Sequence, residues 1–236
     1  MKGAVVSGLG WVTAAGFGSG RIDGPFSWGT GNLPPITRSH VSSRTRSRFG
    51  RLDRYSRLGM AAIAMALHDA GIGPKELQKT AAGLIASTVY GCLETDIDFL
   101  KSAQRNGGRE ASPHLFAFTL SNTFLGEAAI EFGFTGVTYM VNEPRLTGSA
   151  ALFMSLEAIA GGEGDIVVTG LCDLGAPALF PAVDVRAGAL FLVLTKIRAG
   201  APDYGCLTAE KGGMAFEGEN VGDMIELAEA LSGKRR

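Results

Sequence analysis

The sequence predicts an α/β fold, in which short buried strands alternate with helices rich in small residues. Glycine is abundant, at 34 of 236 residues, and it divides the chain into segments of about the length of single elements. These segments alternate between β-branched runs and alanine-rich stretches, which is the order of an α/β domain. The chain is also 46% hydrophobic, so it can bury a sizeable core as one domain or two tightly fused domains.

The first half of the chain contains two predicted strands and two predicted helices. A buried strand covers residues 3–9, and a loop rich in glycine, proline, serine and arginine follows over about residues 14–50. A helix covers about residues 53–70, and its small, apolar character nearly all round predicts burial on most sides. The second strand covers residues 83–88, and an amphipathic helix runs over about residues 93–104.

The second half alternates in the same way. The helix predicted over residues 147–160 has Glu157 as its only charged residue, so we expect it to form the interior layer of the fold. The other predicted elements are helices over residues 121–132 and 221–231 and strands over residues 137–141, 165–170, 188–194 and 206–209.

The charge and cysteine content exclude several classes of function. The formal net charge of −1 argues against a nucleic-acid or membrane-surface binder that works through its overall charge. No apolar run approaches the roughly 18 to 20 residues of a membrane-spanning helix. Glycines also break the first apolar run too early for a signal peptide, so we expect a cytoplasmic protein. Cys92, Cys172 and Cys206 form no C-x-x-C pair, so we expect reduced thiols, no metal site and no cofactor.

Several strings occur in an order that points to a known family. Residues 5–13 read Val-Val-Ser-Gly-Leu-Gly-Trp-Val-Thr, residues 51–56 read Arg-Leu-Asp-Arg-Tyr-Ser, and residues 90–95 read Tyr-Gly-Cys-Leu-Glu-Thr. Further on, residues 187–194 read Ala-Gly-Ala-Leu-Phe-Leu-Val-Leu. In this order and spacing, the strings resemble the β-ketoacyl synthases of the thiolase fold, and the match covers most of residues 3–197.

The resemblance implies an architecture. Members of the family are built from two similar α/β halves, and this chain has room for the first. We therefore expect a thiolase-like half with about five strands in a mixed sheet, helices on both faces and a central buried helix. Residues 1–212 are expected to form the N-terminal-like domain, and residues 213–236 a C-terminal helix with a basic tail.

The resemblance also implies that the catalytic nucleophile is missing. The family carries its cysteine in Thr-Ala-Cys-x-x-Gly, and the matching residues 143–148 read Glu-Pro-Arg-Leu-Thr-Gly, with Arg145 at the cysteine position. A guanidinium stays protonated and cannot attack a thioester. Pro144 replaces an alanine, fixes the backbone of the elbow and removes an N–H donor. We expect Arg145 either to form an ion pair with Glu143 or with a partner carboxylate, or to lie in solvent.

The histidine pair that the family uses belongs to the half that this sequence does not match. His40, His68 and His114 all precede the nucleophile position, so the resemblance implies no condensation by this chain alone. An enzymatic alternative is a ketosynthase-fold acyltransferase that uses Cys172, which follows a predicted strand. Asp173 beside it is either an acid or a helix cap.

A ketosynthase half without a nucleophile fits the role of a partner subunit. Family members dimerise through the strand predicted here over residues 137–141 and the segment before it. Type II polyketide systems pair an active synthase with a cysteine-less homologue, the chain-length factor, which shapes its partner's acyl tunnel. The alternative is that the side chains of this strand and of the segment before it fill the protein's own core. The residues expected at the partner's tunnel or interface are Leu115, Thr119, Asn122, Thr123, Phe124, Tyr139 and Val141.

An arginine-rich segment suggests a second partner. Seven arginines lie within residues 38–57, with Asp53 as the one acid among them. Acyl carrier proteins are acidic, so Arg44, Arg46 and Arg48 are candidates for docking such a protein. The alternative is a solvated loop with a few ion pairs.

The sequence therefore predicts a non-catalytic, chain-length-factor-like subunit that forms a heterodimer with an active β-ketoacyl-acyl-carrier-protein synthase. The expected pathway is type II polyketide or fatty-acid synthesis, and aryl-polyene synthesis fits the resemblance. The expected partners are the synthase and an acyl carrier protein, with no nucleic acid and no membrane. A homodimer that binds a carrier protein or an acyl chain is the remaining alternative.

Overall fold

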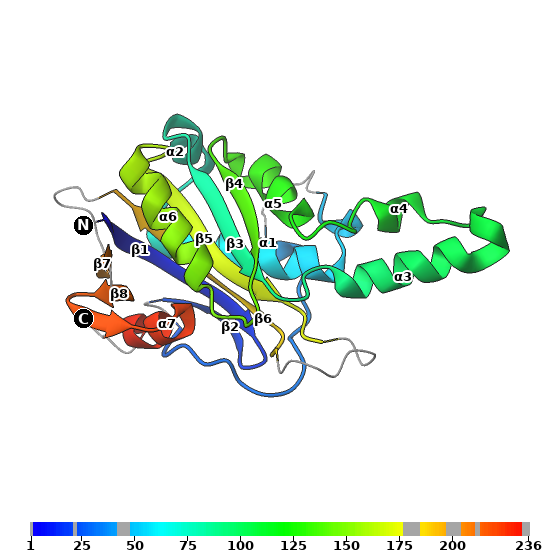
Figure 1. The fold of residues 1–236 in the computed structure, drawn as a ribbon, viewed down its shortest axis with the longest axis horizontal. Coiled ribbons are helices and arrows are strands. Elements are labelled where there is room, and N and C mark those ends of the chain that lie inside the picture. Colours follow the sequence, from blue (N-terminus) through cyan, green and yellow to red (C-terminus); the bar gives the residue numbers. More distant parts are fainter. Residues whose placement is uncertain are drawn as a thin grey trace.

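The structure is a computed structural model that describes residues 2–20, 23–41, 48–176, 185–196, 204–210 and 213–232. Within these residues the chain forms a nine-stranded mixed sheet with helices on both faces (Figure 1), in the order β4-β3-β5-β6-β1-β7-β8-β9, with β2 also paired to β1. The strands are β1 (Lys2–Thr13), β2 (Gly16–Ser19), β3 (Gly83–Thr88), β4 (Thr138–Asn142), β5 (Ile166–Asp173), β6 (Gly188–Thr195), β7 (Gly205–Glu210), β8 (Gly213–Phe216) and β9 (Glu219–Val221). The α-helices are α1 (Arg54–Ala70), α2 (Pro74–Lys79), α3 (Leu93–Gln104), α4 (Pro113–Phe116), α5 (Thr123–Ala128), α6 (Ser149–Gly161) and α7 (Met224–Ser232). Short helical turns are η1 (Arg38–His40), η2 (Phe49–Arg51), η3 (Arg105–Gly108) and η4 (Ala129–Gly133).

Five strands make up the centre of the sheet. β3 pairs in parallel with β4 and β5, whereas β5, β6 and β1 are antiparallel neighbours. Strands β3, β5 and β6 are buried along almost their whole length, because helices cover both faces of the sheet. Strands covered on both faces are continuous apolar runs, which explains the unbroken apolar character of β6. The expected mixed sheet with helices on both faces is confirmed.

Helix α1 covers one face of the sheet. Asp53 caps its start, since its carboxylate accepts a 2.9 Å hydrogen bond from the Ser56 N–H, and a left-handed glycine ends it. The helix packs directly on β1 because Gly8 and Gly10 present no side chains there. A Cβ at Gly10 would collide with the backbone of Ala66, so only glycine allows this close approach.

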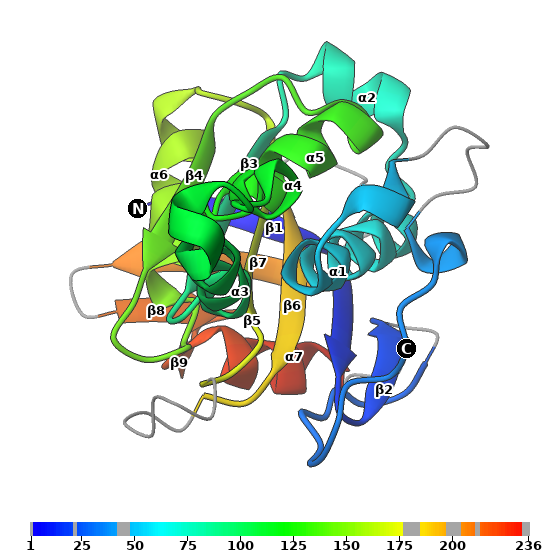
Figure 2. The same ribbon diagram turned by 90° about the vertical axis from the view of Figure 1, so that its right-hand side faces the viewer.

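Helices α6 and α7 cover the other face (Figure 2). Met224 and Leu227 of α7 belong to the same apolar cluster as the buried side of α6. The Met224 N–H donates a 3.0 Å hydrogen bond to the Thr147 carbonyl before α6. At the other end of α7, the hydroxyl of Ser232 accepts a 2.7 Å hydrogen bond from the Phe26 N–H. The segment from β7 to α7 thus extends the sheet and fills the space beside α6.

The burial of α6 is one-sided. Leu152 and Leu156 are fully buried against the sheet, whereas Phe153 is 37% exposed and Glu157 is exposed as well. Helix α6, which was expected to form the interior layer, is therefore covered on one side by the sheet and α7. Its other side is exposed.

A helical arm built from α3 and α4 projects from the body of the protein (Figure 1). Phe99 of α3 packs against Phe116 of α4, with ring centroids 5.4 Å apart. At the base of the arm, Arg54 and Glu94 form an exposed ion pair at 3.4 Å. The chain then returns to the sheet through α5.

The sequence predicted the long elements better than the short ones. The strand over residues 83–88 and the helix over residues 93–104 have the predicted bounds. The helix predicted over residues 121–132 is α5 continued by the π-helical turn η4. The predicted loop after the first strand contains β2, and α2, α4, β8 and β9 were not predicted. Each of these is too short to carry a clear periodicity.

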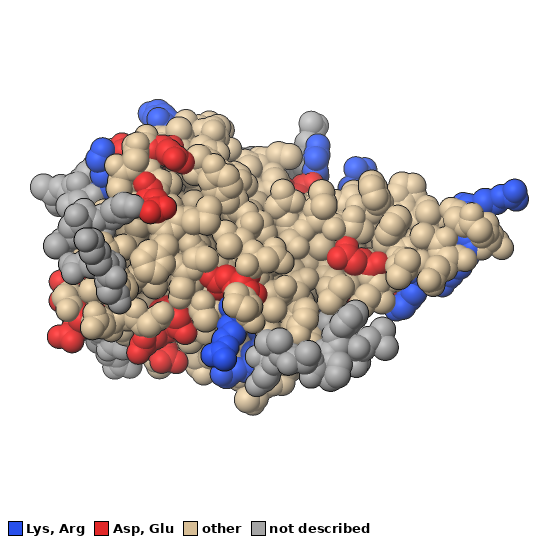
Figure 3. All heavy atoms as spheres, in the orientation of Figure 1, with Lys and Arg blue, Asp and Glu red and all other residues tan. Residues whose placement is uncertain are grey.

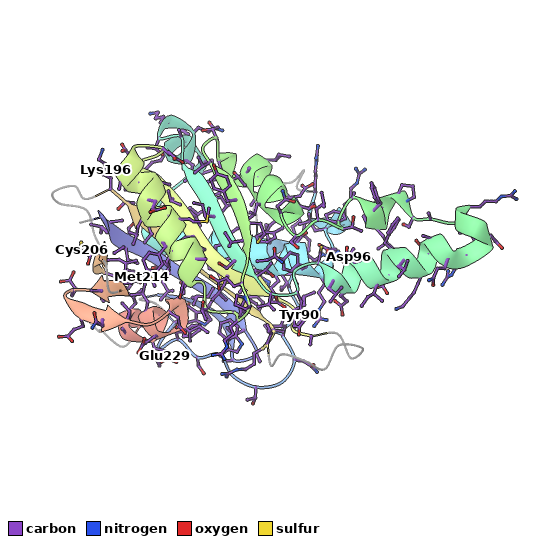
Figure 4. The ribbon with its side chains drawn as sticks, in the orientation of Figure 1. Tyr90, Asp96, Lys196, Cys206, Met214 and Glu229 are labelled. Atoms are coloured by element: carbon purple, nitrogen blue, oxygen red, sulfur yellow. The ribbon has the colours of Figure 1, made fainter. Side chains whose placement is uncertain are left out.

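We expect Leu227→Ala to lower the free energy of unfolding by about 2–5 kcal/mol, because it removes a fully buried side chain and leaves a cavity beneath α7. Glu229→Ala, on the exposed side of the same helix (Figure 4), is the control, with a change within about 0.5 kcal/mol. Urea unfolding followed by circular dichroism measures both variants. Equal stability of the two would mean that α7 contributes little to the core.

Candidate functional site

The elbow between β4 and α6, residues 143–148, occupies the position where the sequence predicts a lost nucleophile. The Glu143 N–H donates a 2.8 Å hydrogen bond to the Thr88 carbonyl, so the backbone follows β3 to the end of the strand. The Glu143 side chain is only 9% exposed. It points from the end of β4 to the first turn of α6.

The carboxylate of Glu143 caps α6. One oxygen, Oε2, accepts hydrogen bonds from the Thr147 N–H at 3.2 Å, from the Thr147 hydroxyl at 3.0 Å and from the Gly148 N–H at 2.9 Å. The other oxygen, Oε1, accepts a 2.6 Å hydrogen bond from the Ala150 N–H. The first N–H groups of a helix lack internal partners and carry partial positive charge. The protein therefore supplies its own anion to this helix N-terminus.

Arg145 does not pair with this carboxylate. Its side chain is exposed, and within the described residues it makes no ion pair. The Arg145 carbonyl accepts a 2.9 Å hydrogen bond from the Thr147 N–H, which tightens the elbow after the exposed Pro144. Of the alternatives given for Arg145, the ion pair with Glu143 is absent, because the backbone of α6 already occupies the carboxylate.

The floor of the elbow is closed by α7. Gly148 adopts a left-handed conformation, with φ of 71°, as the residue before α6. A Cβ at this position would lie 2.9 Å from the Cβ of Met224 and 3.1 Å from a methyl group of Leu171. Only glycine combines this backbone conformation with this contact, so the start of α6 is packed between β5 and α7.

Cys172 is buried beneath α1 and is not a nucleophile in this structure. Its side chain is fully buried, and the thiol contacts the Tyr55 carbonyl at 3.9 Å. Burial raises the pKa of the Cys172 thiol well above its ordinary value, and the nearby Asp173 carboxylate adds to the rise. A reactive cysteine needs an accessible thiolate, so the acyltransferase alternative has no support here.

Asp173 holds the turn after β3. Its Oδ2 accepts hydrogen bonds from the Thr88 hydroxyl at 2.9 Å and from the N–H groups of Val89 and Tyr90 at 2.9 and 2.8 Å. Its Oδ1 accepts a 2.8 Å bond from the Gly175 N–H. Asp173 thus stabilises the loops after β3 and β5 and caps no helix within residues 174–176.

Cys92 and the histidines lie in structural surroundings. Burial raises the pKa of Cys92 to about 11, so its thiol stays protonated beside Asp96 at the base of the arm (Figure 4). His40 stacks on Phe17 with ring centroids 4.1 Å apart, and His114 packs edge-on against Phe118. His68 is exposed in the last turn of α1.

The residues predicted at a partner interface differ in how far they are exposed. Tyr139 is 47% exposed on the edge strand β4, where the described residues provide pairing with β3 alone. Phe124 instead is fully buried, with its ring 5.1 Å from Tyr55 and 6.3 Å from Phe191. Phe124 fills this protein's own core, so its assignment to a partner's tunnel is wrong. The others are Asn122, which is exposed, and Leu115, Thr119, Thr123 and Val141, which are half-buried.

Four large apolar side chains are exposed on β4 and on the segment from α4 to η4. Besides Tyr139, they are Phe116 at the end of α4, Leu120 before α5 and Ile130 in η4, which are 63%, 65% and 63% exposed. Figure 3 shows mostly uncharged side chains over β4 and α5. Exposed apolar side chains near a sheet edge that is unpaired within the described residues are typical of a protein-binding surface. We call Phe116, Leu120, Ile130 and Tyr139 the edge surface.

The predicted docking arginines are described only in part. Arg44 and Arg46 lie outside the described residues, and Arg48 is exposed before η2. In the part of the chain that the structure describes, no group of histidine, cysteine and acidic residues is arranged to hold a metal ion. No helix in that part is both long and apolar enough to cross a membrane.

Residues 38–180 match the family model of the β-ketoacyl synthase N-terminal domain. The chain belongs to the β-ketoacyl synthase family. A 3-oxoacyl-[acyl-carrier-protein] synthase 2 of Rhizobium meliloti (strain 1021) is 29% identical over 121 residues, which is 51% of this chain and 29% of that protein. The match therefore spans less than a third of the length of this curated relative.

Solved structures of ketosynthases share the fold. The ishigamide ketosynthase/chain length factor superposes with a TM-score of 0.69 at 21% identity, over 87% of this chain and 62% of that chain. A type II polyketide synthase acyl-carrier protein in complex with its ketosynthase, AntDE:AntF, gives 0.67 at 17% identity over 88% and 68%. The ketosynthase ApeO in complex with its chain length factor ApeC, from Xenorhabdus doucetiae, gives 0.52 at 18% identity over 71% and 66%.

In this member of the ketosynthase family, the capping role of Glu143 at the elbow was not predicted from the sequence. Glu143 was noted only as a possible partner of Arg145, although an acid shortly before a helix start is a recognisable capping signal. Its role depends on how the elbow folds, because its four donors come from three residues on the far side of the turn.

We expect Glu143→Gln to lower the free energy of unfolding by about 1–3 kcal/mol, because an amide of the same size cannot accept from all four donors and presents its own N–H groups to them. Glu163→Gln, an exposed residue after the end of α6, is the matched control and should change stability little. Chemical unfolding of both variants measures the difference. An unfolding free energy of Glu143→Gln equal to that of the control would contradict the capping role.

Proposed function

We propose that the chain is a non-catalytic ketosynthase-like subunit, a chain-length factor, which dimerises with an active β-ketoacyl-acyl-carrier-protein synthase and shapes its acyl tunnel. The pathway would be type II polyketide or fatty-acid synthesis, and aryl-polyene synthesis is the variant that we favour. The observation that carries this proposal is the Glu143 carboxylate at the N-terminus of α6.

The occupied helix start is incompatible with ketosynthase chemistry at the elbow. A catalytic thiolate needs a helix N-terminus to lower its pKa, and the oxyanion of the intermediate needs free N–H donors. Here the N–H groups of Gly148 and Ala150 already bond to Glu143. A second anion beside that carboxylate would be repelled. Arg145, at the position of the family's cysteine, has no nucleophilic form at a workable pH.

The edge surface supports the proposed dimer. One side of β4 is open within the described residues, so its N–H and C=O groups there can pair with a strand of a second subunit. Tyr139 and Ile130 would be buried by such pairing, which would remove exposed apolar area from water. Two of the similar solved structures bear the names of ketosynthase and chain length factor assemblies, and this supports a synthase as the second subunit.

The segment from α4 to the start of α5 is proposed to reach the partner's tunnel. Leu115, Thr119 and Thr123 are half-buried in this segment. The Thr119 hydroxyl donates a 2.9 Å hydrogen bond to the Phe116 carbonyl, which holds the side chain in one orientation. A residue held in this way can set the depth of a tunnel by its size.

A carrier protein is proposed as the second partner. Arg48 is exposed, and it belongs to a stretch of the sequence that is rich in arginine. An acidic carrier protein would be attracted to exposed arginines of this kind. One similar solved structure is a ketosynthase with its acyl-carrier protein, which supports the assignment of this partner class.

We expect the chain to co-purify as a stable complex with a full-length active ketosynthase from the same pathway. Tyr139→Glu should weaken the complex at least about tenfold, because a carboxylate would be buried without a partner in the interface. Glu229→Lys, which also changes charge but lies on α7, should leave the affinity unchanged. A chain that forms only homodimers, with or without the synthase, would favour the alternative of an acyl-binding homodimer.

We expect Thr119→Phe to shorten the products of the reconstituted pair, because a larger side chain would reduce the depth of the partner's tunnel. Gln104→Phe, at an exposed position at the end of α3 and outside the proposed tunnel and interface residues, is the control for added bulk. Mass spectrometry of the released products measures chain length. Products of unchanged length from a complex that still forms would remove Thr119 from the tunnel.

A further inference from the structure

A cavity of about 380 Å³ lies between the first turn of α1 and the segment that follows β2. One wall is apolar and stiff, since Leu33, Pro34, Pro35 and Ile36 line it and the two prolines fix the backbone. Leu33 and Ile36 also pack against the main core on the α1 side of the sheet. The cavity is therefore built on the opposite face from α6 and its elbow.

The other wall carries two guanidinium groups, those of Arg54 and Arg57. Arg57 is held by the ring of Phe49, with its central carbon 5.0 Å from the ring centroid. Its Nε–H is shielded from solvent and has no hydrogen-bond acceptor. A donor that has lost water without gaining an acceptor is unfavourable, so this guanidinium retains capacity for an anion.

The acids near this wall are already engaged. Asp53 bonds to the Ser56 N–H and to the Thr95 hydroxyl, and Glu94 pairs with Arg54 on the exposed side of the wall. Within the described residues Arg57 makes no ion pair. Its positive charge is therefore the uncompensated charge of the cavity wall.

We propose that this cavity binds a small amphiphilic anion, a carboxylate or phosphate group on a short aliphatic body. The guanidinium groups match the geometry of either anion, and the proline-rich wall suits an aliphatic chain. The volume lies in the range of small-molecule sites, about 300–1,000 Å³. The site is independent of the proposed dimer, because neither the edge surface nor the elbow contributes to it.

Titration calorimetry of the whole chain with octanoate, octyl phosphate and octanol tests the proposal. At least one of the two anions should bind, and octanol should bind at least about tenfold more weakly because it lacks the charge. Arg57→Gln should weaken binding of the anion at least about tenfold, whereas Arg51→Gln, the same change at an exposed arginine outside the cavity, should not. Binding of only one anion would identify which group the site takes.

A second variant guards against a folding defect in Arg57→Gln. Pro35→Glu leaves Arg57 intact and adds a carboxylate at the exposed rim of the cavity, so it should weaken anion binding by repulsion. Thermal unfolding reports whether each variant is folded. Octanol binding as tight as the anions, no binding of either anion, or equal losses for Arg57→Gln and Arg51→Gln would overturn the proposal.

Discussion

The cap that Glu143 places on α6 is the interaction on which the rest of this region depends. The carboxylate fixes Thr147 and Gly148, and these residues in turn contact α7, through the Thr147 carbonyl and the close approach of Gly148 to Met224. The N-terminus of α6 thereby joins β4, α6 and α7. A buried carboxylate with four donors is stable where it lies, and it leaves little capacity for an external anion.

The sheet is covered on both faces by helices of the described chain. Strands β7 to β9 extend the sheet beyond β1, and α7 occupies the face beside α6. At the other end of the sheet, Tyr139 on β4 is 47% exposed. The proposed association would therefore use the edge of the sheet opposite to the one that β7 to β9 extend.

Much of the fold followed from local patterns, whereas the site did not. Strand β6 was predictable because burial on both faces makes it a continuous apolar run. Helix α1 was predictable because its cap involves only residues that are close in sequence. The role of Glu143 was not, since its donors come together only when the elbow folds. Phe124 was misassigned for a similar reason. An apolar residue on the α5 segment can face a partner or its own core, and contacts with Tyr55 and Phe191, distant in sequence, decide which.

The elbow is closed by the protein's own Glu143, and we propose that the chain binds a ketosynthase through the β4 edge. Hydrogen–deuterium exchange of the chain, alone and mixed with a full-length active ketosynthase, measures both features in one experiment. We expect the amides of β4 to exchange more slowly in the mixture, while the start of α6 is protected in both samples by its cap. Unchanged exchange at β4 would exclude this interface, and an unprotected start of α6 in the free chain would exclude the cap.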